Sequence, residues 1–285
     1  MLKNSNAIII VAGEPKSVFL ELFFKTLKKI KNIPLILIAN KKLLIDQAKL
    51  LKKKISIKTL NGNKKLNYRD LNNKNINLVD IPFNYKTLDG IDIKNSNIYI
   101  MKCFEKADQI LKQNKNFKLI NGPVIKKNLL KKKYLGITEF LGTKYKRLDK
   151  VVMLIFNKKL AVSPLTTHLP LKKVHKFITK KRIINHVEQI SKFYKKKFKK
   201  SPKFGITGLN PHCESNFNSS EEDLVIKPAI NFLLKKKFKI SGPFPADTIF
   251  LRENIKKFDV IIGMYHDQVL TPIKTLFEFE AINVT

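Results

Sequence analysis

Short, continuously apolar runs rich in β-branched residues recur along this chain and alternate with longer, lysine-rich amphipathic stretches. Strands are expected at residues 7–12, 34–39, 54–60, 117–122, 150–156, 160–166, 204–209 and 258–264. Helices are expected between them, at about 17–31, 41–52, 98–115, 171–198, 221–237 and 248–257, whereas the Asn-rich segment 61–97 is expected to form loops. Strands that are apolar on both sides belong to sheets covered by helices on both faces. The alternation therefore predicts an α/β fold.

Length and composition restrict the class of protein further. A chain of 285 residues with 44% hydrophobic content can bury a sizeable core. It contains no stretch of about 18 apolar residues, so no membrane span is expected, and its first apolar run is too short for a secretory signal. The two cysteines, Cys103 and Cys213, form no CxxC motif. A reducing cytoplasm is the simplest location.

The net charge of +35, from 57 basic and 22 acidic residues, raises the question of a nucleic-acid partner. The lysines are spread along the chain together with Ile and Asn, a composition that an A+T-rich coding bias also produces. The sequence has no RNA-binding aromatic motif, zinc-finger spacing or helix-turn-helix signal. We therefore expect no specific nucleic-acid partner, and we expect the charge to steer anionic small substrates to the protein.

Three of the five histidines follow predicted strands and have polar neighbours: His168 in TTHLPL, His212 in GLNPH and His266 in MYHDQ. A lone histidine at a strand end is more often a hydrogen-bonded structural residue than a ligand. Ligands of α/β sheets, however, bind just beyond the carboxyl ends of the strands, and imidazole is a common ligand of divalent metals. The joint pattern favours a shared three-histidine metal site. His175 and His186 fall in a lysine-rich helical stretch and are expected to be solvated.

Six sequence blocks, taken in order, resemble one enzyme family. They are GPV-x-K (122–126), G-x-TEF (136–140), TTHLPL (166–171), GLNPH (208–212), GP-x-PADT-x-F (242–250) and MYHDQ (264–268). Together they resemble the 4-hydroxythreonine-4-phosphate dehydrogenase family of vitamin B6 biosynthesis. The resemblance covers essentially the whole chain, and the set of blocks is specific although each block alone is weak.

The resemblance implies a two-domain α/β/α sandwich similar to isocitrate and isopropylmalate dehydrogenases. It is not a GxGxxG Rossmann fold, and the chain contains no GxGxxG motif. The implied domains are an N-terminal α/β domain, 1–135, without its C-terminal return segment, and a metal, substrate and dimerisation domain, 136–285. The family forms homodimers whose active site is shared across the interface, with a metal held by three histidines from both subunits.

The implied reaction is the NAD-dependent, metal-assisted oxidation of 4-phosphohydroxy-L-threonine to a 3-oxo acid, which decarboxylates to 3-amino-2-oxopropyl phosphate. NADP could take the place of NAD, and the divalent metal could be zinc, magnesium or cobalt. The family's cofactor contacts are not assigned to residues here. The family's metal ligands correspond to His168, His212 and His266, and its substrate contacts to Thr138, Lys274 and Asn283.

Two carboxylates are expected to support the chemistry. Asp247 and Asp267 could orient the ligating imidazoles or relay the proton. The alternative for Asp247 is a helix N-cap, because an Asp-Thr pair commonly opens a helix. Lys274 would supply a cation for the phosphate, and its alternative is an ordinary surface lysine.

The chain departs from the family pattern in several places. The first loop reads GEPKSVFLE without the family's later glycines, and Ile125 and Ile137 stand where the family has histidine. These changes favour, as an alternative, a dehydrogenase for a related phosphorylated four-carbon hydroxy acid. The family continues past Thr285, so we expect a C-terminally truncated form, with apolar surface exposed in the first two strands at residues such as Ile8, Ile10, Leu35 and Leu37. A catalytically impaired relative or basic binding protein is the other alternative.

Overall fold

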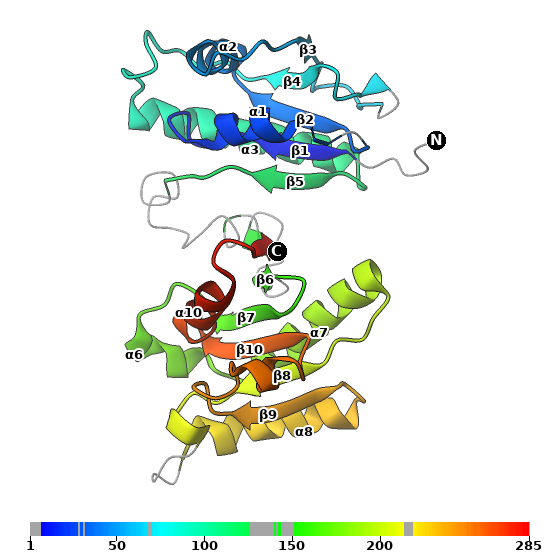
Figure 1. Cartoon of the computed structure of the whole chain (residues 1–285), viewed down its shortest axis with the longest axis vertical. Coiled ribbons are helices and arrows are strands. Elements are labelled where there is room, and N and C mark those ends of the chain that lie inside the picture. Colours follow the sequence, from blue (N-terminus) through cyan, green and yellow to red (C-terminus); the bar gives the residue numbers. More distant parts are fainter. Residues whose placement is uncertain are drawn as a thin grey trace. The chain divides into compact units, whose positions relative to one another are not determined.

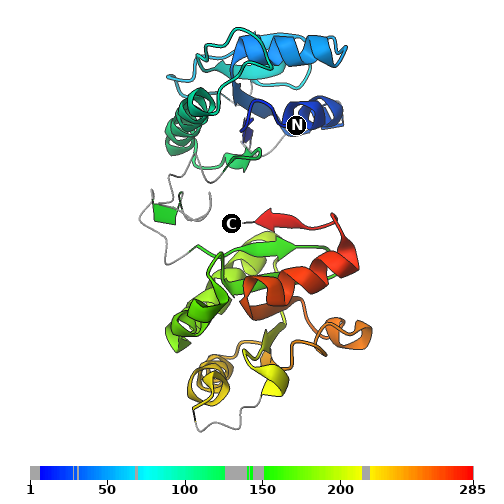
Figure 2. The ribbon, with the colours of Figure 1, turned by 90° about the vertical axis from the view of Figure 1, so that its left-hand side faces the viewer.

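Two compact units, Met1–Tyr134 and Leu135–Thr285, make up the chain. The computed structural model describes residues 7–27, 29–30, 32–67, 70–125, 140, 142–143, 151–213 and 219–284. Each unit is built on its own sheet with helices on both sides (Figures 1 and 2). The predicted α/β architecture is therefore confirmed.

The first unit is a parallel five-stranded sheet in the order β3-β4-β2-β1-β5. Its strands are β1 (Ile8–Val11), β2 (Leu35–Ala39), β3 (Ile57–Thr59), β4 (Ile76–Asp80) and β5 (Lys118–Asn121), and its helices are α1 (Phe19–Leu27), α2 (Lys41–Leu50) and α3 (Ile93–Gln113). All five residues of β2 are buried, because this strand is central in the sheet and carries helices on both faces. Helix α3 packs against β1 and β2.

Strand β4 was missed in the sequence, and the expectation that 61–97 forms loops is wrong for this strand. Its run INLVD buries Ile76, Leu78 and Val79 around a buried Asn77. The Asn77 side-chain amide donates to the carbonyl oxygens of Leu35 at 2.9 Å and of Asn72 at 2.8 Å. These bonds satisfy the Nδ2 donor group, while Oδ1 has no hydrogen-bond partner among the described residues. A buried strand thus forms within a segment whose composition is polar.

The expected exposure of the first two strands is also wrong for three of the four residues named. Ile10 is 6% exposed, Leu35 is 3% exposed and Leu37 is fully buried, whereas Ile8 is half-buried. The central position of β1 and β2 in the sheet explains this result, since each strand is paired on both edges and packed on both faces.

The second unit is a six-stranded sheet in the order β11-β6-β7-β10-β8-β9. Its elements are β6 (Leu154–Phe156), β7 (Ala161–Thr166), α6 (Leu171–Val174), α7 (Lys180–Phe198), β8 (Phe204–Thr207), α8 (Lys227–Lys235), β9 (Ile240–Phe244), α9 (Arg252–Ile255), β10 (Val260–Tyr265), α10 (His266–Phe277) and β11 (Ile282–Val284). Strands β7, β10, β8 and β9 are parallel, while β6 runs antiparallel to both of its neighbours, β7 and β11. Strand β9 was not predicted, and neither was α10, because that helix starts directly at the end of β10.

Alternate side chains of β10 enter two separate cores. Val260 and Ile262 pack with Val187 of α7 on one face of the sheet. Ile261 packs with Val269 of α10 on the other face. Successive side chains of a strand point to opposite faces of the sheet, which explains the two cores. Strand β10 is therefore packed against helices on both faces.

His186 is buried, so the prediction that it is solvated is wrong. It lies on the same face of α7 as Ile183 and Ile190, which pack into the core. Its Nε2 lies 2.7 Å from the hydroxyl oxygen of Ser163, and that hydroxyl donates to the carbonyl oxygen of Met153. Because the single hydroxyl proton is used on Met153, Nε2 must carry a hydrogen and donate to Ser163.

The burial of His186 predicts a loss of stability in acid. Burial, and secondarily the charge of Arg182, lower the pKa of His186 from 6.5 to about 3. The folded state therefore binds this proton less readily than the unfolded state, and stability falls as pH drops from about 6.5 towards 3. We expect a loss of about 1.4 kcal/mol at pH 5.5 relative to neutral pH.

Denaturant unfolding of the wild type and of His186→Gln at pH 7.5 and 5.5 measures this effect. The variant should lose correspondingly less stability in acid, while the control His175→Gln, at an exposed position of the same region, should behave like the wild type. Equal acid destabilisation of wild type and His186→Gln would contradict the assignment.

Candidate metal centre at the carboxyl ends of the strands

Strands β7, β10 and β8 are adjacent and parallel (Figure 1). One of the predicted ligands follows each of them in the sequence. His168 follows β7 by two residues, His212 follows β8 by five, and His266 is the first residue of α10. Since the strands are parallel and neighbouring, their carboxyl ends lie at one edge of the sheet. The topology therefore places all three histidine-bearing segments at the same edge.

His168 and His266 lie together. Their ring centroids are 5.7 Å apart, with the ring planes inclined at 36°. His266 Nδ1 lies 2.8 Å from the Asp267 carboxylate and donates to that oxygen. The lone pair of Nε2 is therefore the one that can bind a metal ion. His168 is exposed and His266 is partly exposed. Two accessible imidazoles, one already oriented by a carboxylate, fit a borderline divalent metal.

His212 is exposed on a short 3-10 helix, Pro211–Cys213. Within the described ranges, no group of three or more His, Cys, Asp or Glu side chains is placed to hold a metal. His168, His212 and the adjacent Cys213 have φ angles of 49°, 55° and 59°. This left-handed region costs a non-glycine residue on the order of 1–3 kcal/mol, and such strain persists only where surrounding contacts enforce it.

Buried hydrogen bonds enforce the positions of the strand ends. The Thr166 hydroxyl donates to the Met264 carbonyl at 2.7 Å and ties β7 to β10. Gln268 Oε1 accepts from the Met264 N–H at 2.7 Å and from the Thr207 hydroxyl at 2.8 Å, and its Nε2 donates to the Gly208 carbonyl at 2.8 Å. We call Thr166, Thr207 and Gln268 the strand-end lattice. It links the segments that carry His168, His266 and His212.

Gly208 is required where β8 enters the His212 loop. A Cβ atom at this position would lie 2.7 Å from Cys213 Sγ and 2.9 Å from Glu222 Oε1. Burial raises the pKa of the Cys213 thiol, and the charges of Glu222 and Asp247 act in the same direction. The loop thus folds back tightly on itself, and Asp247 lies near it, close enough for its charge to act on Cys213.

The other predicted site residues lie on separate elements. Asp247 is exposed in the turn after β9, and α9 begins only at Arg252, so the N-cap alternative for Asp247 is wrong. Lys274 is exposed in the last turn of α10, eight residues or about 12 Å of helix rise from His266. Asn283 is exposed on β11, opposite Ile155. Thr138 lies outside the described residues.

The strand-end lattice itself was not recognised in the sequence. Gln268 stands two residues after His266 in the MYHDQ block, at a position where helix α10 turns its buried face to the sheet. A polar residue on a buried helix face was the available signal. Its partners Thr166 and Thr207 gave no separate signal, because threonine is common in strands.

Two sequence blocks of the first unit also meet at strand ends. The Glu14 N–H donates to the Pro123 carbonyl at 2.8 Å. A Cβ atom on Gly13 would come within 2.3 Å of the Pro123 carbonyl oxygen, and one on Gly122 within 2.1 Å of the Ala12 carbonyl oxygen. The two glycines therefore let the loops after β1 and β5 cross in direct contact.

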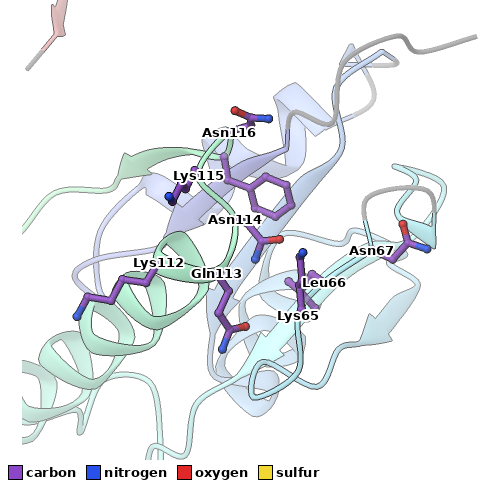
Figure 3. Close-up of a pocket in the computed structure, with 9 residues that line it drawn as sticks. Lys65, Leu66, Asn67, Lys112, Gln113, Asn114, Lys115 and Asn116 are labelled. Carbon is purple, nitrogen blue, oxygen red and sulfur yellow. The ribbon is translucent and has the colours of Figure 1, made fainter.

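A basic cavity of about 610 Å³ lies at the other end of this sheet, beside the start of β5 (Figure 3). Its lining includes Lys65, Lys112 and Lys115, together with side-chain amides such as that of Gln113. None of the six sequence blocks contributes to it. The cavity is therefore separate from the strand ends that carry the histidines.

Comparison with known proteins decides the family. The model of the family described as pyridoxal phosphate biosynthetic protein PdxA matches residues 31–285. The chain belongs to the PdxA family. It is 34% identical over 287 residues to a 4-hydroxythreonine-4-phosphate dehydrogenase of Sulfurihydrogenibium sp. (strain YO3AOP1), covering 98% of this chain and 85% of that protein. A protein of the same name from Wigglesworthia glossinidia brevipalpis is 32% identical, with coverage of 100% and 86%.

Solved structures agree with the PdxA assignment at the level of fold. A 4-hydroxythreonine-4-phosphate dehydrogenase from Klebsiella pneumoniae superposes with a TM-score of 0.79 at 22% identity, covering 97% of this chain and 87% of that one. One from Burkholderia phymatum gives a TM-score of 0.76 at 23% identity, with coverage of 99% and 88%. The predicted fold class and the resemblance drawn from the six blocks are both confirmed.

The strand-end lattice predicts a large penalty for replacing Gln268 with an apolar residue of similar size. Gln268→Met would leave the Met264 N–H and the Gly208 carbonyl unpaired in a buried setting. We expect the free energy of unfolding to fall by roughly 2–4 kcal/mol. Denaturant unfolding measures it, with Gln189→Met as the matched control, since the Gln189 amide donates to Asn185 within the same helix and not to a strand end. A loss no greater than that of the control would show that the lattice contributes little.

Proposed function

We propose that this PdxA-family chain is an NAD-dependent, metal-assisted dehydrogenase that oxidises 4-phosphohydroxy-L-threonine in pyridoxal phosphate biosynthesis. The resulting 3-oxo acid loses carbon dioxide to give 3-amino-2-oxopropyl phosphate. Membership of the PdxA family is the evidence for this reaction. The paired His168 and His266 rings at the strand ends are the structural observation that supports metal assistance.

The imidazole donor set fits zinc or cobalt better than magnesium, which prefers oxygen ligands. His212 would be the third imidazole in a homodimer that shares the site between subunits. When bound, the metal would acidify the substrate hydroxyl, and the nicotinamide of NAD or NADP would accept the hydride. Asp267 orients the His266 ring through Nδ1. This carboxylate therefore leaves Nε2 as the ring nitrogen of His266 that would bind the metal.

The remaining residues have roles set by their chemistry and position. Asp247 is exposed near the His212 loop, and we assign it the role of relaying the proton of the substrate hydroxyl. The Lys274 ammonium would pair with the substrate phosphate. Thr138 and Asn283 would supply hydrogen bonds to the substrate, as the family resemblance implies.

The cytoplasm is the proposed location. Across the described part of the chain, no helix combines the length and hydropathy that a bilayer crossing demands. A reduced state of Cys103 and Cys213 agrees with this location, since the two thiols are free. The proposed partners are the small phosphorylated substrate and a second copy of the chain, with no specific nucleic acid and no membrane.

A second candidate substrate is a related phosphorylated four-carbon hydroxy acid. Ile125 and Ile137 stand in blocks where the family has histidine, and Ile125 is 39% exposed just beyond β5. An isoleucine cannot donate the hydrogen bond that a histidine offers to a substrate oxygen. Loss of such donors would relax the preference for the amino acid substrate.

A turnover assay tests the proposed reaction. Purified protein is incubated with NAD, Co²⁺ and 4-phosphohydroxy-L-threonine, or with a phosphorylated four-carbon hydroxy acid in its place. We expect NADH formation that requires the metal and is faster with 4-phosphohydroxy-L-threonine. Faster turnover of the four-carbon acid would favour the second candidate, and absence of NADH with both substrates would contradict the proposed function.

Metal binding can be tested without turnover. Asparagine tolerates the left-handed backbone that His212 adopts, so His212→Asn removes the imidazole with little backbone strain. We expect this variant to lose at least tenfold in Co²⁺ affinity by calorimetric titration. His175→Asn, at an exposed histidine outside the six blocks, is the matched control and should titrate like the wild type. Unchanged affinity of His212→Asn would exclude His212 as a ligand.

A further inference from the structure

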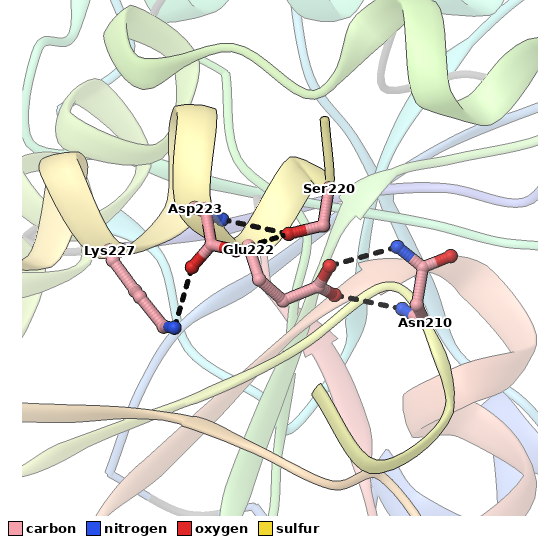
Figure 4. A network of polar contacts seen from close by, with 5 residues as sticks. All are labelled: Asn210, Ser220, Glu222, Asp223 and Lys227. Atoms are coloured by element: carbon pink, nitrogen blue, oxygen red, sulfur yellow. Dashed lines mark hydrogen bonds and ion pairs between the residues drawn. The ribbon is translucent and has the colours of Figure 1, made fainter. Parts of the chain in front are cut away.

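Glu222 is a fully buried carboxylate in a strongly basic chain, yet it pairs with no lysine or arginine in the described residues. Its Oε1 accepts from the backbone N–H groups of Leu209 at 2.7 Å and Asn210 at 2.8 Å. Its Oε2 accepts from the Asn210 side-chain amide at 2.8 Å (Figure 4). Burial alone would raise the pKa of Glu222, but these hydrogen bonds lower it. Glu222 is therefore an ionised acceptor at neutral pH.

The groups that Glu222 binds all belong to the loop between β8 and His212. Leu209 and Asn210 precede His212 by three and two residues. His212 and Cys213 then adopt left-handed backbone angles, which their own conformational preferences oppose. Charge-assisted hydrogen bonds to backbone N–H groups are stronger than neutral ones. The Glu222 carboxylate is thus placed to hold the loop in a conformation that it would otherwise leave.

The neighbouring Asp223 has a different set of partners. It accepts from the Ser220 hydroxyl at 2.9 Å and pairs with the Lys227 ammonium at 2.6 Å, and both partners are close to it in the sequence. Its side chain is 63% exposed. Glu222 and Asp223 open a π-helical turn, Glu222–Ile226, a rare element that is frequent at functional sites. The two adjacent acids therefore have different surroundings: Glu222 faces the loop that carries His212, and Asp223 faces solvent.

We propose that Glu222 is a positioning residue for the metal centre, which sets the place of the His212 imidazole through the backbone of Leu209 and Asn210. The inference rests on the proposed function, since it takes His212 as a metal ligand. Glu222 itself contacts neither metal nor substrate. Gly208 contributes to this positioning, because only a residue without Cβ lets the Glu222 carboxylate approach the loop backbone.

The test compares Glu222→Gln with Asp223→Asn in the full chain. Each change replaces a carboxylate with the amide of the same shape at adjacent positions. In Glu222→Gln, the new amide would set a donor against the Asn210 amide or against the two backbone N–H groups. We expect a 10- to 100-fold loss of Co²⁺ affinity for Glu222→Gln, measured by calorimetry at a temperature where circular dichroism shows a folded protein. Asp223→Asn should stay within about twofold of the wild type, because it touches no atom of the loop.

Amide hydrogen exchange supplies a readout independent of the metal. The peptide that contains Leu209 and Asn210 should exchange faster in Glu222→Gln than in the wild type or in Asp223→Asn, with little change elsewhere in the unit. If Glu222→Gln does not fold, Asn210→Ala, which removes the side-chain amide that donates to Glu222 and also to Glu221, should still weaken Co²⁺ binding several-fold, and Glu221→Gln is its control. Wild-type Co²⁺ affinity in the folded variant would overturn the proposal.

The wild type and His212→Asn distinguish this failure from that of the proposed function. If those two proteins bind Co²⁺ equally, or neither binds it, His212 is not a ligand and the metal role of Glu222 is overturned with it. If the wild type binds Co²⁺, His212→Asn does not, and Glu222→Gln binds as the wild type does, only the positioning role is overturned.

Discussion

The geometry of the unit Leu135–Thr285 depends on the hydrogen bonds of the Gln268 side-chain amide. One buried amide group joins the carboxyl ends of β8 and β10 by accepting from a strand N–H and a threonine hydroxyl and by donating to a loop carbonyl. Any shift of one strand end against the other would leave one of these groups unpaired in a buried setting, which is costly. The ends of two strands that carry predicted ligands are therefore held in fixed register.

Strain and restraint are matched around the histidines. His168 and His212 adopt backbone angles that non-glycine residues rarely take, so their segments must be held by contacts from elsewhere. Thr166 provides such a contact on the β7 side, and Glu222 provides it on the β8 side. The imidazoles of His168 and His212 are exposed and that of His266 is partly exposed, with the His266 ring oriented by Asp267. Buried supports that hold accessible imidazoles in place are what a preorganised metal centre requires.

Much of the architecture could be predicted from the sequence, because apolar β-branched runs at regular spacing have few other uses. The histidines were recognised for the same reason, since each follows such a run. Strand β4 was missed because its short run lies in an Asn-rich segment and contains the polar Asn77, which is buried in the sheet. Helix α10 was missed because no loop separates it from β10. His186 was predicted to be solvated because the many lysines of this segment made the buried face of α7 hard to recognise. The strand-end lattice depends on the spatial order β7-β10-β8, which a single sequence does not reveal.

The location of a bound metal tests the central claim most directly. Anomalous diffraction from crystals of the Co²⁺-loaded protein would place the ion without reference to activity. The account predicts one strong peak per active site, at the carboxyl ends of β7, β8 and β10, with imidazole nitrogens of His168, His212 and His266 as ligands drawn from two subunits. A peak elsewhere, or a site that lacks any one of these three imidazoles, would contradict it.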